Sequence, residues 1–320
     1  MSKITTATEL LLHHPGDISR AIDAHTSRWK ICRLLSDEAF LKLRFFLCIH
    51  KHLSLKNPVT FNEKLQWLKI HDRDPLYNTL VDKIAVKQYI VDHIGQEYII
   101  PTLGIWDKTE EIDFNSLPDQ FVLKCTHDTG SVIVCRDRNK FDTTAARIKL
   151  NEALKENAYW FGREWPYKDV KPRIIAEKYM TDGENDTELT DYKFYCFNGN
   201  MECVMVCYDR GSGDTKFYFF DHEWNLLRIN KRGREAPEDF TLPKPKNFEK
   251  MIQLAERLSK DILFVRVDFY NCNGNIYFGE MTFYPQSGFD PNYLPETDRY
   301  FGSLIDLSIV RERMKVREKA

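Results

Sequence analysis

A short segment near the C-terminus, residues 264–282, holds the side chains best suited to chemistry. Apolar and polar residues alternate there as in a half-buried strand, and the charged ones are Arg266 and Asp268. Asn273-Gly274 predicts a tight turn, because both central positions of a type I′ turn need positive φ. The return strand ends at Glu280, so the hairpin brings two carboxylates to the same end.

Two neighbouring carboxylates repel each other unless a cation neutralises them, and hard oxygen ligands of this kind suit Mg²⁺. Arg266 precedes Asp268 by two residues on the same face of the strand, where it could hold a phosphate. The alternative is an edge hairpin whose charged side chains are solvated. The segment alone leaves both interpretations open.

Two lysines lie inside predicted strands. Lys124 belongs to the apolar run 121–125 and precedes a turn ending at Gly130, whose backbone N–H groups would suit phosphate oxygens. Lys193 alternates with aromatic residues in a later strand. Each lysine is either a cation for phosphate or a solvated residue on the face of a strand. His127, in the turn, is better explained by packing than by catalysis.

The tetrapeptide Glu177-Lys178-Tyr179-Met180 ends another predicted strand in an exposed hinge. A purine there would bond to the peptide groups of Lys178 and Met180, with Glu177 accepting from its amino group. A strand that simply runs into a polar turn is the alternative. Glu184, seven residues after Glu177, would suit ribose hydroxyls or be plain loop charge.

The motif Asp72-Arg-Asp74 has the D-x-D form of many glycosyltransferases. However, Asp74-Pro75 is better explained as a helix N-cap followed by proline at the first helical position. Further helix starts are predicted at Ser36, at the capping box Thr60–Glu63 and at Asn247. Helices dominate the first hundred residues and strands follow, which predicts an α+β fold with mainly antiparallel sheets.

The composition excludes several classes of protein. The 320 residues are 42% hydrophobic and carry a net charge of −2, so no global basic field would attract nucleic acid or anionic lipid. Eight cysteines without a C-x-x-C pair predict reduced core residues. No signal peptide is visible, and the apolar run at residues 45–49 is far too short for a membrane span. We therefore expect a cytoplasmic protein.

Taken in their order, a strand lysine, a glycine turn, the hinge and the charged hairpin resemble the ATP-grasp superfamily over residues 82–288. Residues 57–67, Leu80-Val-Asp-Lys83 and Gly279-Glu-Met-Thr-Phe283 are similar to its TupA-like branch. Members of that branch occur with genes for cell-wall and capsular polysaccharides, and some carry a glycosyltransferase label.

The resemblance implies that two α+β lobes clamp ATP. It assigns Lys124, Lys193 and, as a third cation, Lys83 to the phosphates, with Gly130 in the turn that covers them. It further assigns Glu177, Lys178, Tyr179 and Met180 to adenine, Glu184 or Asp182 to ribose, Asp268 and Glu280 to Mg²⁺, Arg266 to the transferred phosphoryl group, and Ser287-Gly288 to substrate.

One position departs from the pattern of the superfamily. Asparagine usually follows the metal-binding glutamate by two residues, and this chain has Thr282 there. A hydroxyl can still bind Mg²⁺, so Thr282 is the third metal ligand that the resemblance implies, and one or two metal ions remain possible.

The resemblance also divides the chain. Residues 1–56 form an N-terminal helical region, 57–115 a helical part before the nucleotide site, and 116–180 the small lobe. Residues 181–306 form the large lobe with the metal site, and 307–320 a C-terminal helical tail.

The activity implied is an ATP- and Mg²⁺-dependent ligase that joins a carboxylate to an amine through an acyl phosphate. The branch suggests a uronic acid as the carboxylate, free, nucleotide-linked or polymeric, and an amino acid or small amine as its partner. Three alternatives remain: a phosphotransferase of the same fold, a polysaccharide glycosyltransferase that uses Asp72-x-Asp74, and a binding module without catalysis.

Overall fold

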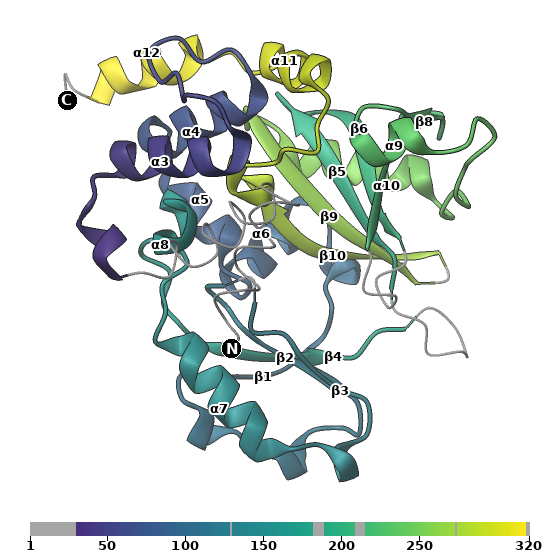
Figure 1. The fold of residues 1–320 in the computed structure, drawn as a ribbon. Coiled ribbons are helices and arrows are strands. Elements are labelled where there is room, and N and C mark those ends of the chain that lie inside the picture. The colour runs from purple at the N-terminus through teal and green to yellow at the C-terminus, as the bar shows by residue number, and fades with distance from the viewer. Residues whose placement is uncertain (1–29, 129, 182–188, 209–214, 273, 318–320) are drawn as a thin grey trace, which may run out of the picture.

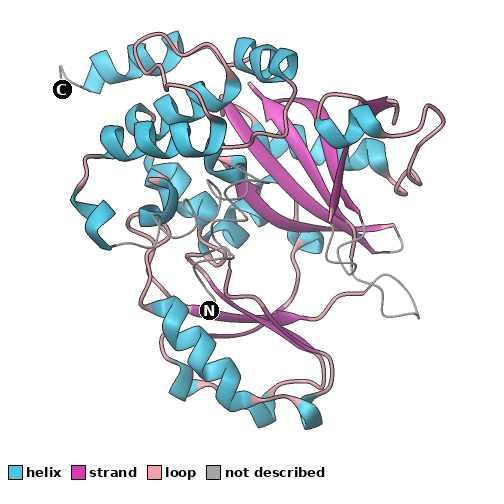
Figure 2. Ribbon diagram, in the orientation of Figure 1, coloured by secondary structure: helices cyan, strands magenta, loops and turns pink. Residues whose placement is uncertain are grey.

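Two antiparallel sheets form the two lobes of the molecule (Figure 1). The computed structural model describes residues 30–128, 130–181, 189–208, 215–272 and 274–317. Helices surround both sheets, as Figure 2 shows. The predicted α+β fold with mainly antiparallel sheets is therefore confirmed, whereas the helices expected before residue 30 lie outside the described residues.

The small lobe is built on a four-stranded sheet with the order β1-β4-β2-β3. Its strands are β1 (Thr102–Trp106), β2 (Phe121–Cys125), β3 (Ile133–Cys135) and β4 (Ile174–Lys178). Phe121, Leu123 and Cys125 are buried and alternate with partly exposed residues, the pattern of a sheet with one face on a core. Helix α7 (Thr143–Leu154) covers that face, and short 3-10 turns η3 (Thr109–Glu111), η4 (Phe114–Ser116) and η5 (Arg138–Lys140) flank it.

The large lobe has a six-stranded sheet with the order β10-β9-β5-β6-β7-β8. The strands are β5 (Asp191–Phe197), β6 (Asn200–Tyr208), β7 (Lys216–Phe220), β8 (Leu226–Leu227), β9 (Phe264–Cys272) and β10 (Asn275–Thr282). Helix α10 (Phe248–Ser259) packs on one face, where the ring of Phe248 meets that of Phe194 at 6.0 Å. The opposite face presents the charged residues of β5 and β9.

Helices at both ends of the chain pack around the large lobe. The first are η1 (Lys30–Leu34), α3 (Asp37–Ile49), α4 (Phe61–His71), α5 (Pro75–Val81), α6 (Ala85–His93) and η2 (Gln96–Tyr98). Later ones are α8 (Tyr159–Gly162), η6 (Trp165–Tyr167), α9 (Lys231–Glu235), η8 (Pro285–Gly288), α11 (Pro295–Ser303) and α12 (Ser308–Arg317). The predicted caps at Ser36 and Asp74 and the capping box of Thr60 are all present.

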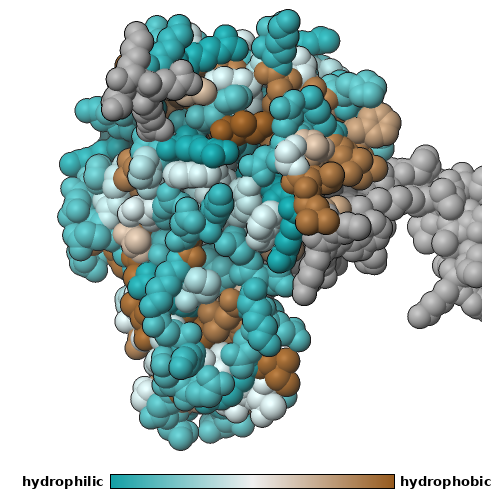
Figure 3. Space-filling model, turned by 90° about the vertical axis from the view of Figure 1, so that its left-hand side faces the viewer, coloured by the Kyte–Doolittle hydropathy of each residue, from teal (hydrophilic) through white to brown (hydrophobic). Residues whose placement is uncertain are grey.

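The small lobe appears in Figure 3 as a narrower body below the larger one, and the face shown is mostly hydrophilic with scattered apolar patches. Within the described part of the chain, no helix has both the length and the apolar character needed to cross a bilayer.

Candidate functional site

The charged residues of the hairpin lie in rows across three strands of the large sheet. Lys193 on β5 is opposite Asp268 on β9, which is opposite Glu280 on β10. Directly opposed residues of neighbouring strands share a face. Asp268 is only 1% exposed and Arg266 8%, and β9 lies inside the sheet. The hairpin lies at the edge of the sheet, with β10 as its outer strand, but the expectation that its charges are solvated is wrong for Arg266 and Asp268.

A bulge at Gly279 turns Glu280 toward this face. The pairing of β10 with β9 shifts by one residue between Phe278 and Glu280, so Phe278 opposes Phe269 while Glu280 opposes Asp268. Without the extra residue, Phe278 and Glu280 would share one face of the strand. A Cβ at Gly279 would lie 3.1 Å from the carbonyl oxygen of Asp268, so glycine suits this close approach.

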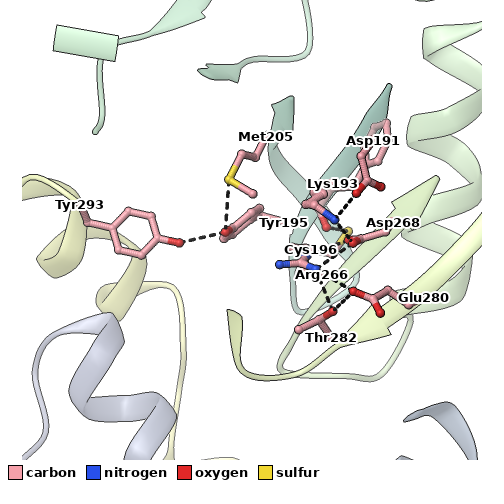
Figure 4. Close-up of polar contacts among 11 residues, drawn as sticks. Asp191, Lys193, Tyr195, Cys196, Met205, Arg266, Asp268, Glu280, Thr282 and Tyr293 are labelled. Atoms are coloured by element: carbon pink, nitrogen blue, oxygen red, sulfur yellow. Dashed lines mark hydrogen bonds and ion pairs between the residues drawn. The ribbon is translucent and has the colours of Figure 1, made fainter. Parts of the chain in front are cut away.

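These side chains form one network, drawn in Figure 4. Arg266 donates from Nε and Nη2 to the two carboxylate oxygens of Asp268, at 2.7 Å each. Its Nη2 also donates to Glu280 at 3.1 Å and to the hydroxyl of Thr282 at 3.0 Å. Lys193 pairs with Asp268 at 2.5 Å and with Asp191 at 2.7 Å. The site thus holds three carboxylates, two cations and one hydroxyl.

Burial and neighbouring charges act on the pKa of each carboxyl group in opposite directions, and the balance differs between Asp268 and Glu280. Burial raises the pKa of Asp268 to about 6, although Arg266 and Lys193 oppose it. Burial also acts to raise the pKa of Glu280, but the charges of Arg266, Lys193 and Lys83 outweigh it and lower the value to about 2. The side chain of Glu280 is 41% exposed, so it is the carboxylate that solvent and ligands reach most easily.

The donor set of this network suits Mg²⁺. Asp268, Glu280 and Thr282 offer two carboxylates and a hydroxyl, and Mg²⁺ commonly takes one or two carboxylates together with water and substrate phosphates. Among the described residues, no three His, Cys, Asp or Glu side chains gather as a metal cage. A metal here would therefore depend on phosphate ligands, and it would compete with Arg266 for the oxygens of Asp268.

A second charged group lies in the small lobe around Glu177, which is 5% exposed. Lys124 on β2 pairs with one of its carboxylate oxygens at 2.5 Å, and Lys87 on α6 pairs with the other at 2.6 Å. Burial acts to raise the pKa of Glu177, but the two lysines lower it below its ordinary value. Lys124 is thus not a solvated lysine, since its side chain is 19% exposed.

The hinge after Glu177 lines a cavity of about 250 Å³. Lys124, Glu177 and the three hinge residues Lys178, Tyr179 and Met180 line it together, against valines of β2 and β3. The backbone N–H of Lys178 donates to the carbonyl of Pro101 at 3.0 Å, so only the carbonyl of Lys178 can face a ligand. Glu184 and Asp182, the two residues expected at ribose, lie outside the described residues.

The remaining two residues expected at phosphate, Lys83 and Gly130, lie at the turn that follows β2. Lys83 donates to the carbonyl of Asp128, and burial lowers its pKa, although Glu280 acts in the opposite direction. Gly130 lies on the small-lobe side, where an added Cβ would meet no atom within 4 Å. The described turn therefore leaves open space beside Gly130.

The turn at Ser287-Gly288 is held from behind by α4. Gln286 and Ser287 both have positive φ, at 49° and 51°, a conformation that costs residues other than glycine energy. Buried Lys69 donates to the carbonyl of Ser287 at 2.7 Å, and Gln66 donates to that of Gly288 at 2.6 Å. The hydroxyl of Ser287 donates to Glu164. Both residues expected at substrate are thus fixed by internal contacts.

A second cavity, of about 330 Å³, lies on the other side of Arg266. Tyr195 and Tyr293, whose hydroxyls are 2.9 Å apart, form part of its wall. Pro285 and Gln286, directly before Ser287, contribute to it as well. Arg266 is the residue that belongs both to this cavity and to the carboxylate network.

The Asp72-x-Asp74 motif is used locally. Asp74 caps α5 by accepting from the N–H of Leu76 at 3.0 Å, as the sequence predicts. Asp72 is 6% exposed and accepts from the hydroxyl of Tyr77 at 3.0 Å. These contacts account for both carboxylates as structural residues, so neither needs to bind the metal of a nucleotide-sugar donor.

Two members of these networks were not predicted from the sequence. Asp191 lies two residues before Lys193 on the same strand, so strand alternation could have identified it. Lys87 lies on α6, and no local pattern connects it with Glu177, which is ninety residues later in the chain. Only the tertiary fold brings the two together, because α6 packs on the core of the large lobe through Val86 and Ile90 while Lys87 reaches Thr102 and Glu177 of the small sheet.

Comparison with known proteins gives one family. The family model described as TupA-like ATPgrasp matches residues 63–306. No curated protein matches the sequence. Among solved structures, D-alanine–D-alanine ligase from Bacillus anthracis complexed with ATP is similar at 15% identity, with a TM-score of 0.41 over 76% of this chain and 67% of that one.

Two further structures are similar at comparable levels. The ATP-grasp ligase PsnB, complexed with a variant of its minimal precursor, Mg and ADP, has 12% identity and a TM-score of 0.40 over 76% of this chain and 64% of that one. The D-cycloserine synthetase DcsG has 14% identity and a TM-score of 0.39 over 74% and 72%. The family assignment itself rests on the sequence model.

Proposed function

This chain belongs to the TupA-like ATP-grasp family, and from that premise we propose that it is an ATP- and Mg²⁺-dependent carboxylate–amine ligase. Its carboxylate substrate is a uronic acid, free, nucleotide-linked or within a polysaccharide, and its amine is an amino acid or small amine. The reaction serves the biosynthesis of capsule or cell-surface polysaccharide. The branch that the sequence resembles supports the polysaccharide context.

The small lobe would bind the nucleotide. Adenine would enter the cavity that Lys178, Tyr179 and Met180 line at the hinge, and it would bond to the carbonyl of Lys178 and the backbone of Met180. Lys87 and Lys124 share the single charge of Glu177, so the pair has positive charge left for phosphate oxygens. Lys83 would add a third cation from between the lobes.

The large lobe would bind the metal. Asp268, Glu280 and Thr282 would hold Mg²⁺, which would supply positive charge to stabilise the phosphoryl group during transfer. Lys193 and Arg266 already compensate these carboxylates. If Mg²⁺ neutralised part of the carboxylate charge, Lys193 and Arg266 could interact with phosphate oxygens instead.

The position of Arg266 is the observation that supports a carboxylate as the acceptor. Its hydrogen bonds to Asp268, Glu280 and Thr282 use Nε and Nη2. Figure 4 shows the remaining guanidinium nitrogen turned away from the carboxylates, toward the side of Tyr195 and Tyr293, which line the second cavity. An arginine in this place can hold a substrate carboxylate beside the phosphoryl group.

The chemistry is balanced without a covalent enzyme intermediate. A carboxylate oxygen of the substrate attacks the γ-phosphorus of ATP, and the bond to ADP breaks, giving an acyl phosphate. The amine then attacks the acyl carbon, loses a proton and displaces inorganic phosphate, which keeps the former carboxylate oxygen. Arg266 and Lys193 orient and neutralise the reacting groups in a buried site, where such interactions are strongest.

The test is to incubate the protein with Mg²⁺-ATP, a panel of uronates and a panel of amines. We expect ADP release that requires both a carboxylate and an amine, and a product whose mass equals the two substrates less one water. ADP release that ignores the carboxylate would refute the ligase. A phosphorylated acceptor would instead identify a phosphotransferase.

A further inference from the structure

The second cavity adjoins the carboxylate network on the same face of the large sheet. Tyr195 is opposite Arg266 in the pairing of β5 with β9, one row beyond Lys193 and Asp268. The cavity continues from there over β6 and β7 to the segment after η8. A molecule in it would therefore lie beside the phosphoryl site and outside the hinge cavity.

The floor of the cavity is aromatic. Tyr195, Phe219 and Tyr293 are buried, and the ring centroids of Tyr195 and Phe219 lie 5.5 Å apart. The two tyrosine hydroxyls bond to each other at 2.9 Å, so each ring presents an apolar surface with a polar end. Such a floor suits a flat-sided ring that has C–H groups on its faces and hydroxyls on its edge.

The remaining wall is polar, with Arg232, Gln286, Asp290 and Asn292. Asp290 accepts from the backbone N–H of Asn292 at 2.9 Å and also interacts with the side chain of Asn292, and a carboxylate can accept further hydrogen bonds. Hydroxyl groups can donate to such an acceptor and accept from the side-chain amides. Asn230, by contrast, has a structural role, because it donates to the carbonyl of Phe217 and accepts from the N–H of Gly233.

Charge and size narrow the ligand further. Arg232 and Arg266 line the cavity together with one carboxylate, Asp290. Because Arg266 shares its charge with Asp268 and Glu280, a ligand carboxylate would approach the guanidinium nitrogen that those ion pairs do not use. The cavity measures about 330 Å³, which is at the lower end of the roughly 300–1,000 Å³ typical of small-molecule sites. That volume suits one monosaccharide, and the nucleotide of a nucleotide sugar would lie outside the cavity.

We infer that this cavity binds one hydroxylated six-membered ring with its carboxylate directed at Arg266, so that the acceptor is a free hexuronate rather than a nucleotide-linked one. The inference rests on the proposed function, in which the carboxylate of the bound ring is phosphorylated and then joined to an amine. Asp290, Asn292 and Arg232 are then the residues that determine specificity.

The test blocks the cavity from its rim. In Asn292→Trp the exposed asparagine gains a large ring at the cavity, and in the matched control Lys250→Trp the same ring lies on an exposed position of α10, on the opposite face of the sheet. Binding of the gluco, galacto and manno hexuronates is measured by calorimetry on the full chain with Mg²⁺ and a non-hydrolysable ATP analogue. D-Glucose and UDP-glucuronate serve as the uncharged and the nucleotide-linked probes.

We expect at least one hexuronate to bind, and both other probes to bind about tenfold more weakly or worse, since each lacks the carboxylate or exceeds the cavity. Asn292→Trp should weaken the hexuronate about tenfold while the ATP analogue binds as before, and Lys250→Trp should change neither.

The inference is overturned if no hexuronate binds, if UDP-glucuronate binds as tightly as the free acid, or if Asn292→Trp leaves hexuronate binding unchanged. A hexuronate that binds in the cavity and is never joined to an amine refutes the proposed function while leaving this inference standing. Wild-type protein that fails to bind the ATP analogue also refutes the proposed function alone.

Discussion

The two lobes present opposite surpluses of charge to the space between them. In the small lobe, Lys87 and Lys124 share the single carboxylate of Glu177. In the large lobe, the three carboxylates of Asp191, Asp268 and Glu280 form ion pairs with two cations, Lys193 and Arg266, and Lys83 acts on Glu280 without an ion pair. Counted over these ion pairs, the first group has positive charge left over and the second has negative charge left over.

This difference corresponds to the two halves of a metal–nucleotide complex. Phosphate oxygens are attracted to the lysines of the small lobe, and a divalent cation to the carboxylates of the large lobe. The charges of each group are fully neutralised only when the phosphates and the divalent cation are both bound. The comparison therefore predicts that variants of the two lobes have different effects on nucleotide and on metal.

The largest effect is expected from Asp268→Asn in the large lobe. This change removes the carboxylate that contacts both Lys193 and Arg266, and with it a metal ligand that supplies several kcal/mol of transition-state stabilisation. We expect no measurable ADP release, together with loss of the Mg²⁺ dependence of ATP binding. Asp191→Asn, which pairs only with Lys193 among the contacts of the network, is the matched variant and should retain turnover. Turnover near wild type in Asp268→Asn would show that catalysis does not depend on Asp268 as a metal ligand.

In the small lobe, Glu177→Gln removes the charge that two lysines share. Breaking a buried ion pair on one side leaves charge uncompensated, so the free energy of unfolding should fall by about 3 kcal/mol. Because ATP phosphates can replace the lost charge, ATP should raise the melting temperature of this variant more than that of wild type. Chemical and thermal unfolding with and without ATP measure both effects. If ATP raised the melting temperature of the variant and of wild type equally, Lys87 and Lys124 would have no uncompensated positive charge for phosphate.

A smaller effect is expected from Lys124→Met, which keeps the length of the side chain and removes its charge. Loss of one charge-assisted contact should weaken ATP binding by about 2 kcal/mol, roughly thirtyfold. The Mg²⁺ dependence should persist, because the metal ligands lie in the other lobe. Titration of ATP at several Mg²⁺ concentrations tests this, and Lys250→Met, at an exposed lysine of α10, is the control. If Lys124→Met instead removed the Mg²⁺ dependence, the division between the lobes would be wrong.

The smallest effect is expected from Thr282→Val, which preserves shape and removes the hydroxyl. Thr282 donates to Glu280 at 3.2 Å and accepts from Arg266 at 3.0 Å. Without the hydroxyl, we expect the affinity of the protein for Mg²⁺ to fall by about 1 kcal/mol. Mg²⁺ titration of ADP release measures it. Complete loss of Mg²⁺ binding would place Thr282 among the essential metal ligands, equal to Asp268.

Local patterns were enough to predict much of this molecule. The caps at Ser36, Thr60 and Asp74 follow from short-range hydrogen bonding, and the turn at residues 273–274 is enough to bring Asp268 and Glu280 to the same end of the hairpin. Asn247 shows where local reasoning fails: α10 starts after it as predicted, but its side chain donates to the carbonyl of Gly274 at 2.8 Å and does not cap the helix. A tertiary contact replaced the local one.

The rest of the site depends on contacts between distant segments. Lys87 reaches Glu177 only because α6 packs on the core of the large lobe and directs this side chain to the small sheet, and the second cavity is formed by strands, α9 and the segment after η8 together. The bulge at Gly279 is an intermediate case, since a glycine within a strand is a signal for a bulge but does not show which face the next residue takes. Sequence patterns therefore identified most members of the carboxylate network, whereas they gave no indication of the cavity beside it.

The central claim is that a substrate carboxylate held by Arg266 becomes an acyl phosphate. Labelling the carboxylate oxygens of the accepted uronate with ¹⁸O and examining the released phosphate by ³¹P NMR tests it directly. The proposed ligase transfers one labelled oxygen into inorganic phosphate for each amide formed. Unlabelled phosphate, released together with ADP in the presence of both substrates, would contradict it.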